Sequence, residues 1–496
     1  MRGQSDVTRK IPAIALVLLS AGAIAVLSDS ALSPSWVMVI LGAVVALLPF
    51  AAAALRGRMD VFQPIYLFSF CYAVLFVVRP AFDLAGNGST QWLGYPIASG
   101  YFLALVIGLI GAIGFYCGYA APIGARAAGR MPLPTGKWAI SSLAGFVMAS
   151  VLVSGLLFTA FVWSIGGFGN VGALLAGRSE FLRQAQIASS GYLYSAPLWL
   201  GSIGLLILAI VRRWRSAAGL LGFLLVVASQ VESLAFGDRS WWLPMATSIG
   251  ILFYCRRGRR PGARTLATTA VLVLLFGITV PRMYREADNR TQSFAQVIQQ
   301  TASSPFDALQ SLFQSLDTAM VDGLAMEAQD VPSAIPYQFG STYLEALTRP
   351  VPRSLWSGKP IEAEALLMQR LLPDLASRHI LFYFSAFGEP YLNLGLPGVL
   401  LFGFVFGAAW RLLYEWFRRA PTNPCVFAIY AASWPCLFIY MRGGVGVDYQ
   451  RQVIMILPMI LAMYVAYARR STKVTPDGDR LTSDSPRVAG AATIEA

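Results

Sequence analysis

Charge is scarce in this chain of 496 residues: only 13% are Asp, Glu, Lys or Arg, whereas 56% are hydrophobic. A typical soluble domain carries about twice that share of charge. Uncharged runs of about 18 residues or more recur along the sequence, and one soluble core cannot bury so many. We therefore expect an all-α polytopic membrane protein.

Cysteine and histidine are also sparse, which excludes a disulfide framework and zinc-finger spacing. No two cysteines form a CxxC pair, and the single histidine is His379. We expect no metal and no cofactor. The five cysteines lie in or at the ends of apolar runs, at Cys71, Cys117, Cys255, Cys425 and Cys436.

The apolar runs predict about twelve transmembrane helices. Acidic residues are nearly absent from them, whereas ion-coupled transporters usually carry carboxylates in mid-membrane. The predicted spans are 11–28, 36–55, 62–78, 100–120, 140–163, 193–211, 216–235, 241–255, 265–281, 395–415, 425–441 and 452–468.

Basic residues predict the orientation, because Lys and Arg favour cytoplasmic segments. With the N-terminus inside, the inner segments hold 21 of them and the short outer loops hold six. The net charge of +13 is thus a topology signal and not a nucleic-acid surface. The prediction is a multi-pass protein with both termini in the cytoplasm. Its parts are a membrane domain (1–281, nine spans), a large outer loop (282–392), a second membrane domain (393–468, three spans) and a disordered cytoplasmic tail (469–496).

The large outer loop is predicted to be partly helical. Apolar residues at three- and four-residue steps predict one helix from Pro305 to Leu324, with an apolar face that packs on the membrane domain or at its interface. A second helix is expected at 361–372, ended by Pro373. Prolines 350, 352 and 360 stiffen the segment that carries Arg353 and Lys359. This segment is either a structural brace or a rigid mount for cations that bind an anionic or carbohydrate group.

Other candidate groups are few. His379 titrates near neutral pH and is either structural or catalytic. Glu389 is either a base or a helix cap. Arginines on the predicted outer face run against the charge rule, and each either pairs with a nearby acid such as Asp448 or contributes to a phosphate-ester site. These arginines are Arg178, Arg183, Arg239, Arg442 and Arg451.

Three motifs resemble the Wzy-type O-antigen polymerases, also called oligosaccharide repeat-unit polymerases. They are Gly237-Asp238-Arg239 between two spans, Pro352-Arg353-Ser354-Leu355-Trp356 followed by Lys359-Pro360, and Gly388-Glu389-Pro390-Tyr391-Leu392-Asn393-Leu394-Gly395 before a span. The sequence has Asp238 where the family more often has Ser, and Leu394 where Phe is commoner. The architecture of about twelve spans with one large outer loop is similar over nearly the whole chain.

The resemblance implies a fold related to the GT-C membrane glycosyltransferases. It implies polymerisation of undecaprenyl-diphosphate-linked repeat units on the periplasmic face of the bacterial inner membrane, with release of undecaprenyl diphosphate. The product would be O-antigen, capsule or exopolysaccharide. The expected partners are the lipid-linked glycans and the bilayer, with a chain-length regulator and a flippase as further partners, and no nucleic acid.

This reaction assigns roles to the candidate residues. Arg239 and Arg353 are expected to stabilise the leaving diphosphate, and Glu389 or His379 to act as the base, with Asp448 as a third candidate. Expected substrate-binding residues are Arg178, Lys359, Arg442, Arg451, Tyr343, Trp356, Tyr391, Asn393 and Asp448.

Two other functions remain open. O-antigen ligases share the architecture and also use outer-face Arg and His. A flippase or other transporter of lipid-linked oligosaccharide needs no large outer loop, although some lipid flippases use arginines.

Overall fold

The structure is a computed structural model. It describes residues 33–468 apart from 58, 87–90, 135, 165–166, 168–196, 236–238, 281, 284–293, 350, 352–354 and 378–381. The described chain forms two compact units, each assembled from separate stretches of sequence. The first predicted span (11–28) and the predicted tail (469–496) lie outside the described residues.

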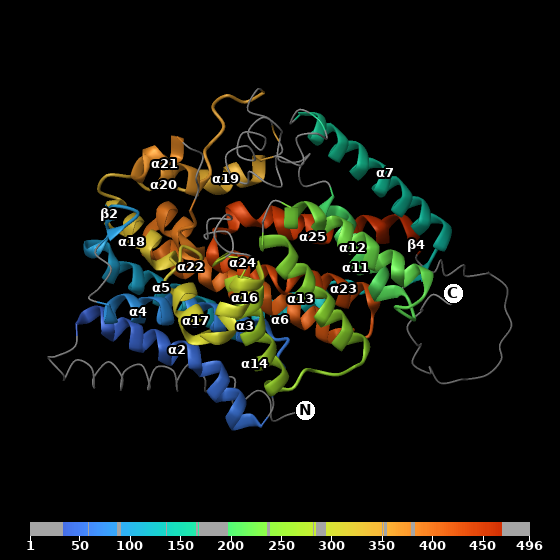
Figure 1. Cartoon of the computed structure of the whole chain (residues 1–496), viewed down its shortest axis with the longest axis horizontal. Helices are drawn as coiled ribbons and strands as arrows, with labels where there is room; N and C mark the ends of the chain where they lie inside the picture. The colour runs from blue at the N-terminus through green and yellow to red at the C-terminus, as the bar shows by residue number, and fades with distance from the viewer. Residues whose placement is uncertain are drawn as a thin grey trace. The chain divides into compact units, whose positions relative to one another are not determined.

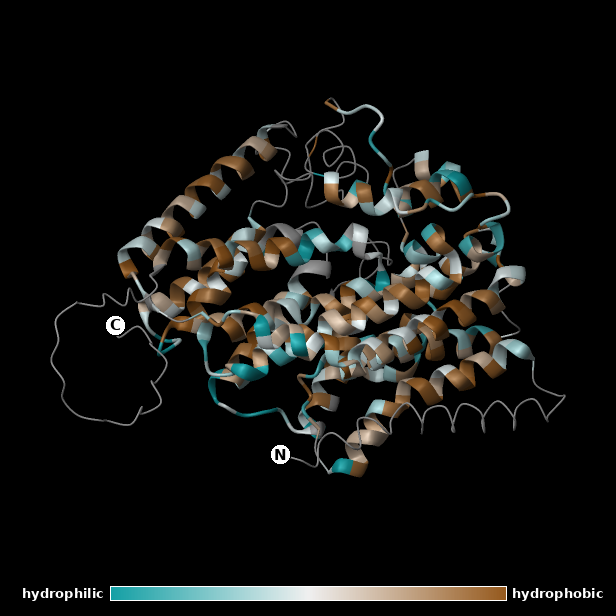
Figure 2. Cartoon of the chain, turned by 180° about the vertical axis from the view of Figure 1, so that it is seen from behind, coloured by the Kyte–Doolittle hydropathy of each residue, from teal (hydrophilic) through white to brown (hydrophobic). Residues whose placement is uncertain are grey.

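Seven helices of the described residues are long and apolar enough to cross a membrane: Pro34–Arg56, Pro64–Ala85, Ala98–Ala120, Ile140–Trp163, Ser385–Arg419, Pro424–Arg442 and Asp448–Ala466. The prediction of a helical membrane protein is confirmed at this level, and the count of twelve stays a prediction. Figure 2 shows hydrophobic residues along these long helices, with hydrophilic residues mostly in the connections and short helices. Helices that are apolar all round are typical of membrane spans.

The first unit comprises residues 1–130, 260–415 and 436–450. Its long helices are α2 (Pro34–Arg56), α5 (Ala98–Ala120) and α22 (Ser385–Arg419), together with a continuous run of α3 (Pro64–Ala73), the π-helix η1 (Val74–Val78) and α4 (Arg79–Ala85). Shorter helices are α24 (Cys436–Arg442) and α14 (Ala263–Leu272) with the π-helix η2 (Val273–Thr279). A short helix α6 (Pro122–Arg130) and a hairpin of β1 (Gln91–Trp92) with β2 (Tyr95–Pro96) complete these parts.

The predicted outer loop supplies six more helices to the first unit. They are α16 (Phe294–Ser303), α17 (Pro305–Phe313), α18 (Met320–Asp330), α19 (Ser341–Thr348), α20 (Ala363–Leu371) and α21 (Pro373–Ser377). The expected helix at 361–372 is confirmed as α20, and Pro373 begins the next helix.

The prediction of a single helix from Pro305 to Leu324 is wrong, because α17 ends at Phe313 and α18 begins at Met320. Hydroxyl groups occupy the carbonyls that a continuing helix would use. Ser315 Oγ donates to Leu312 O at 2.6 Å, and Thr318 Oγ1 donates to Phe313 O at 2.9 Å. The apolar face does pack inward, since α18 is buried from Met320 to Ala328.

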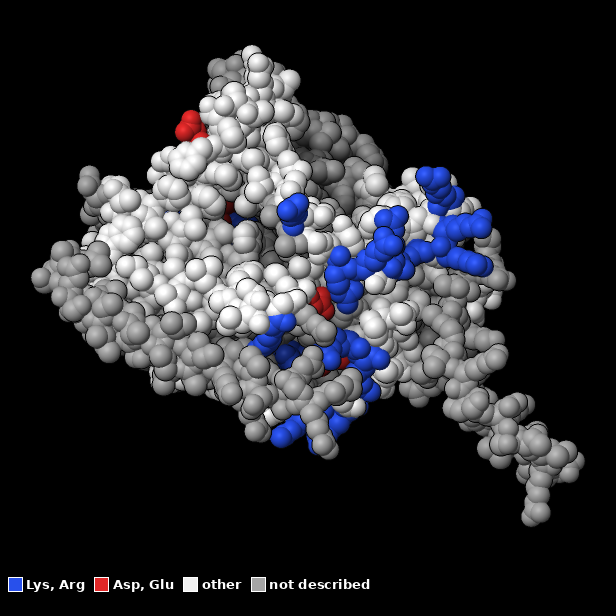
Figure 3. Space-filling view, turned by 90° about the horizontal axis from the view of Figure 1, so that it is seen from below, with Lys and Arg blue, Asp and Glu red and all other residues white. Residues whose placement is uncertain are grey.

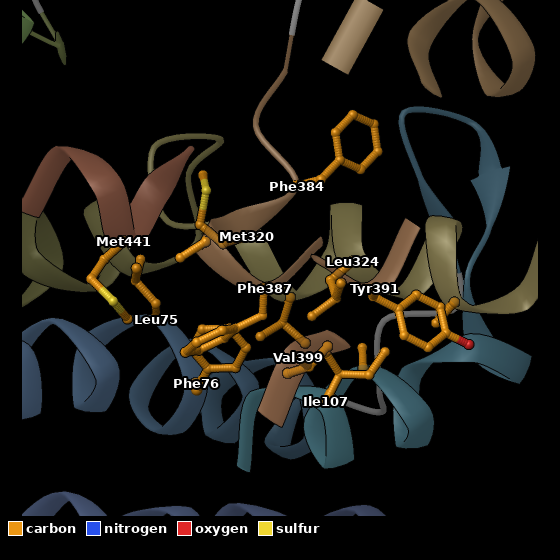
Figure 4. Packing of buried hydrophobic residues seen from close by; sticks show 14 of the residues in the cluster. Leu75, Phe76, Ile107, Met320, Leu324, Phe384, Phe387, Tyr391, Val399 and Met441 are labelled. Carbon is orange, nitrogen blue, oxygen red and sulfur yellow. The ribbon is translucent and has the colours of Figure 1, made fainter. Parts of the chain in front are cut away.

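Helix α18 lies directly against α5 (Figure 1). A Cβ added at Gly100 of α5 would lie 2.0 Å from Ala325 O of α18, so only glycine allows this approach. The two helices share one apolar cluster with α22, in which Phe387 lies among Phe76, Leu324 and Val399 (Figure 4). A helix of the predicted outer loop is thus built into the core of the first unit.

Helices α5 and α22 meet through their backbones. A Cβ at Gly118 would lie 1.8 Å from Phe404 O, and one at Gly407 would lie 2.0 Å from Phe115 O. Gly111, Gly114 and Gly403 extend the same contact. Small residues at spacings of three or four are typical of tight helix pairs in membranes, where dispersion attraction replaces the hydrophobic effect.

The second unit comprises residues 131–259, 416–435 and 451–496. It contains α7 (Ile140–Ser164), α11 (Leu198–Ile210), α12 (Ala217–Ala235), α13 (Arg239–Arg256) and α23 (Pro424–Ser433), and most of α25 (Val445–Ala466). Helix α11 is buried at every residue except the partly buried Trp199, and it contacts α12, α13 and α23 (Figure 1). A two-stranded ladder pairs β3 (Lys137–Trp138) with β4 (Tyr467–Ala468).

Candidate functional site

The candidate site is a buried polar cluster around Glu389, in the first ten residues of α22. Helix α22 is interrupted at Gly395, whose φ of 63° and ψ of −154° are not helical. A Cβ at Gly395 would lie 2.8 Å from the Tyr337 hydroxyl, so glycine is required there on both counts. The Gly388–Leu394 motif therefore forms a separate helical segment ahead of the apolar part of α22.

Glu389 is fixed by a short chain of hydrogen bonds. Thr342 Oγ1 donates to Glu389 Oε1 at 3.0 Å, and Asn393 Nδ2 donates to Thr342 Oγ1 at 2.8 Å. The same amide group contacts Glu389 O at 2.7 Å, while Asn393 Oδ1 accepts from Gly340 N at 2.7 Å. Asn393 thus joins the start of α19 to α22 and orients the Thr342 hydroxyl toward Glu389.

A glycine turn, residues 443–446, contributes two backbone donors. Gly446 N donates to Glu389 Oε2 at 2.8 Å, and Gly444 N donates to Glu364 Oε1 at 3.1 Å. Both carboxylates are nearly inaccessible, with Glu389 3% exposed and Glu364 4% exposed. Three segments far apart in the sequence, α20, α22 and the glycine turn, therefore meet at these two carboxylates.

Glu327 of α18 lies under the cluster and is fully buried. Neither carboxylate oxygen meets a donor in good hydrogen-bond geometry among the described residues. Burial raises the pKa of Glu327 well above its usual range, with the nearby charges of Glu364 and Glu389 adding to the effect. The pKa of Glu364 is likewise raised, first by burial and then by Glu389. Such shifts favour the protonated form of both carboxyl groups.

An ion-pair group lies at the end of α19. Arg349 contacts Glu345 at 2.6 Å and Glu362 at 3.1 Å. Lys359 Nζ is 3.6 Å from Glu345 and donates to the carbonyls of Arg349 and Val351 at 3.2 and 3.3 Å. Lys359 is 7% exposed, so its ammonium group is held inside the protein and is not an ordinary surface charge.

Of the five candidate arginines named in the sequence analysis, Arg442 is the one that lies in the first unit with a described side chain. It contacts Asp317 at 3.3 Å and lies 5.5 Å from the ring centre of Tyr383. The side chain of Arg442 keeps 23% of its surface exposed, unlike Lys359. Asp448 is 2% exposed, and its carboxylate lies against Gly443.

The remaining predicted residues are only partly described. Arg353, His379, Arg178 and Arg183 lie outside the described residues. Arg239 is the first residue of α13, and Arg451 lies in α25, both in the second unit. Tyr391 is buried in the core, and its hydroxyl donates to Val331 O at 3.3 Å. Tyr343 is half-buried, and burial raises its pKa, whereas Trp356 is exposed.

Sequence reasoning missed a second buried charge cluster. Arg79 lies 3.0 Å from Asp83 and 3.3 Å from Asp322, and it donates to Phe313 O at 3.0 Å. The signal available was an arginine and an aspartate four residues apart at the end of a predicted span. The third member of the cluster, Asp322, lies 239 residues after Asp83 in the chain, so sequence spacing alone does not reveal it.

Within the described ranges, no group of three Asp, Glu, His or Cys side chains has the arrangement of a metal site. The carboxyl groups of the cluster accept hydrogen bonds from backbone N–H groups, and burial favours the neutral form of Glu327 and Glu364. Comparison of the chain with protein-family models, curated protein sequences and solved structures gave no match.

Proposed function

We propose that the chain is a membrane glycosyltransferase that polymerises undecaprenyl-diphosphate-linked oligosaccharide repeat units on the outer face of the bacterial inner membrane. The observation that carries this proposal is the convergence at Glu389. The motif from Gly388 to Gly395 contacts Thr342 of the predicted outer loop and Gly446 of the last predicted outer loop. Segments that the charge rule assigns to one side of the membrane therefore build one polar site.

The predicted topology has support at the opposite ends of the helices as well. In the first unit, Asp60 contacts Arg260 at 3.0 Å and accepts from Tyr414 at 2.8 Å. In the second unit, Arg256 donates to Arg212 O at 2.7 Å, and Arg419 donates to Met131 O at 2.8 Å. All of these residues belong to predicted cytoplasmic segments or their borders. Figure 3 shows a face with many exposed Lys and Arg side chains and few acidic ones.

The proposed reaction transfers a glycan from its diphosphate carrier to a sugar hydroxyl. The hydroxyl oxygen attacks the anomeric carbon, the bond from that carbon to the diphosphate oxygen breaks, and the diphosphate leaves with the electron pair. Arg239 and Arg353 would stabilise the developing negative charge. The hydroxyl proton passes to a base, for which His379 and Glu389 are the candidates.

A ligase and a flippase are the alternatives. The three functions are separated by which glycan accumulates when the gene is deleted, and where. Loss of a polymerase leaves single repeat units on the final acceptor. Loss of a ligase leaves long chains on the lipid carrier with none transferred. Loss of a flippase leaves repeat units on the cytoplasmic leaflet.

The test is gel analysis of surface glycan in a deletion strain complemented with wild type or variants. We expect deletion to collapse the ladder to one repeat unit, and Arg239→Ala or Arg353→Ala to fail to restore it at normal membrane levels. Arg370→Ala is the matched control, because Arg370 is an exposed arginine of α20 in the same loop. A normal ladder in the deletion strain would refute the polymerase function. Full activity of either variant would remove that arginine from the mechanism.

A further inference from the structure

The glycine turn at residues 443–446 is shaped around two carboxylates. A Cβ at Gly446 would lie 2.3 Å from Glu389 Oε1, and one at Gly444 would lie 2.6 Å from Glu389 Oε2. Any side chain at either position would therefore displace Glu389 from the backbone N–H groups. The glycines allow the carboxylates of Glu389 and Glu364 to reach the turn.

The turn leads into the N-terminus of α25, which begins at Val445. The first N–H groups of a helix have no partner within the helix, and this end carries a partial positive charge. Glu389 and Glu364 supply two acceptors there, at Gly446 and Gly444. Two N–H groups at this helix end are thus bonded to the protein's own carboxyl groups.

Glu389 has little freedom to act as a base. It is 3% exposed, and each of its oxygens already accepts a hydrogen bond, one from Thr342 and one from Gly446. Each oxygen keeps a second lone pair, so the restriction comes from burial, because a general base must lie within hydrogen-bond reach of the proton that it removes. The glycine turn directly follows Arg442, whose side chain is partly exposed, unlike Glu389. Gly443 of the turn lies against Asp448 and Tyr383.

We propose that Glu389 and Glu364 are positioning residues, which hold the glycine turn so that Arg442 faces the substrate, and that Glu389 is not the base. This inference rests on the proposed function.

The first test compares Glu389→Gln with Glu389→Ala in full-length protein, by extension of lipid-linked repeat units in vesicles across pH. The amide oxygen of Gln accepts from Gly446 N–H but cannot take up a proton. Loss of a general base costs about 10²–10⁴-fold in rate. We expect Gln to retain activity within about tenfold with an unchanged acid limb of the pH profile, and Ala to lose about 100-fold or more. A Gln variant that is inserted normally but loses 10²-fold, or loses the acid limb, would overturn the proposal.

The second test does not depend on activity. It measures the rate of amide hydrogen exchange in peptides covering residues 440–450, which contain the glycine turn. Gly446→Ala and Glu389→Ala should both speed exchange there, whereas Glu389→Gln should stay near wild type. Gly145→Ala is the control, because a Cβ at Gly145 meets no described atom within 4 Å. Unchanged exchange in both Gly446→Ala and Glu389→Ala would also overturn the proposal. If Glu389→Ala does not reach the membrane, Gly446→Ala and Glu389→Gln carry the comparison.

A double-mutant cycle separates positioning from a general loss of fold. If Glu389 acts through the turn that carries Arg442, then Glu389→Ala should cost much less activity in an Arg442→Ala background than in wild type. Additive losses would contradict the proposal. If wild type extends no repeat unit at all, the proposed function fails, while the exchange measurement still decides whether the carboxylates hold the turn.

Discussion

Substitution of Gly407 by alanine should loosen the contact between α5 and α22. The added Cβ would lie 2.0 Å from Phe115 O and 2.8 Å from Tyr119 N. A carbon and a carbonyl oxygen approach to about 3.3 Å, so the helices must separate locally by roughly 1.3 Å. Because both obstructing atoms belong to the backbone, no side-chain rotation relieves the clash.

The cost follows from the lost contacts. A gap of about 0.5–1 Å forfeits roughly a quarter to a half of each atom pair's attraction of about 0.1–0.2 kcal/mol, over the many pairs of a helix interface. Overpacked cores typically lose about 1–3 kcal/mol. For a unit of this size, each kcal/mol lowers the melting temperature by about 2–4 °C. We therefore expect a drop on the order of 5 °C.

The assay is the loss of the monodisperse chromatographic peak after heating in detergent, at one heating rate for all variants. Membrane proteins of this size unfold irreversibly, so only differences between variants are interpreted. Gly145→Ala in α7 is the matched control, and it should be neutral or slightly stabilising, because alanine is the better helix former. If Gly407→Ala and Gly145→Ala melt together, the two helices do not meet through their backbones and the packing described for α5 and α22 is wrong.

Two further predictions concern buried charges. Burial raises the pKa of Glu327, so folding favours its neutral form, and the stability from this group is present below about pH 4.3 and is lost as pH rises through the raised pKa. Glu327→Gln should therefore flatten the fall in melting temperature from mildly acidic to alkaline pH. Parallel pH profiles of wild type and variant would contradict this. Lys359→Met should lower the free energy of unfolding by about 1–3 kcal/mol. Arg349 still neutralises Glu345 in this variant, but the hydrogen bonds from Lys359 to backbone carbonyls are lost. Loss of polymer with an unchanged melting temperature would instead make Lys359 a substrate ligand.

Local sequence pattern was sufficient for most of the long helices. The apolar runs at 36–55, 100–120 and 140–163 match α2, α5 and α7 within two residues at each end. The run at 395–415 is part of a longer element, because the polar Gly388–Leu394 motif is itself helical and Gly395 separates it from the apolar part. Hydropathy detects the apolar part only, since the motif gains its burial from tertiary contacts.

The site depends on pairs that no local pattern contains. Glu389 and Gly446 are 57 residues apart, and Glu364 and Gly444 are 80 residues apart. The sequence indicated that Glu389 acts either as a helix cap or as a base. The cap interpretation considered only the helix that follows Glu389 in the chain. The helix whose end Glu389 occupies is α25, and that pairing requires the folded arrangement of α22 and the glycine turn.

Electrostatics links the ion pairs to the proposed substrate. A cavity for a diphosphate must keep its own carboxylates from repelling the ligand. In the first unit, Glu345 is neutralised by Arg349, and Asp317 contacts Arg442, while Glu364 and Glu389 accept backbone N–H groups. Burial also favours the protonated form of Glu327 and Glu364, which removes negative charge without a cation. The negative charge of Glu345 and Asp317 is thus balanced within the first unit, which lowers the repulsion that an incoming diphosphate would meet there.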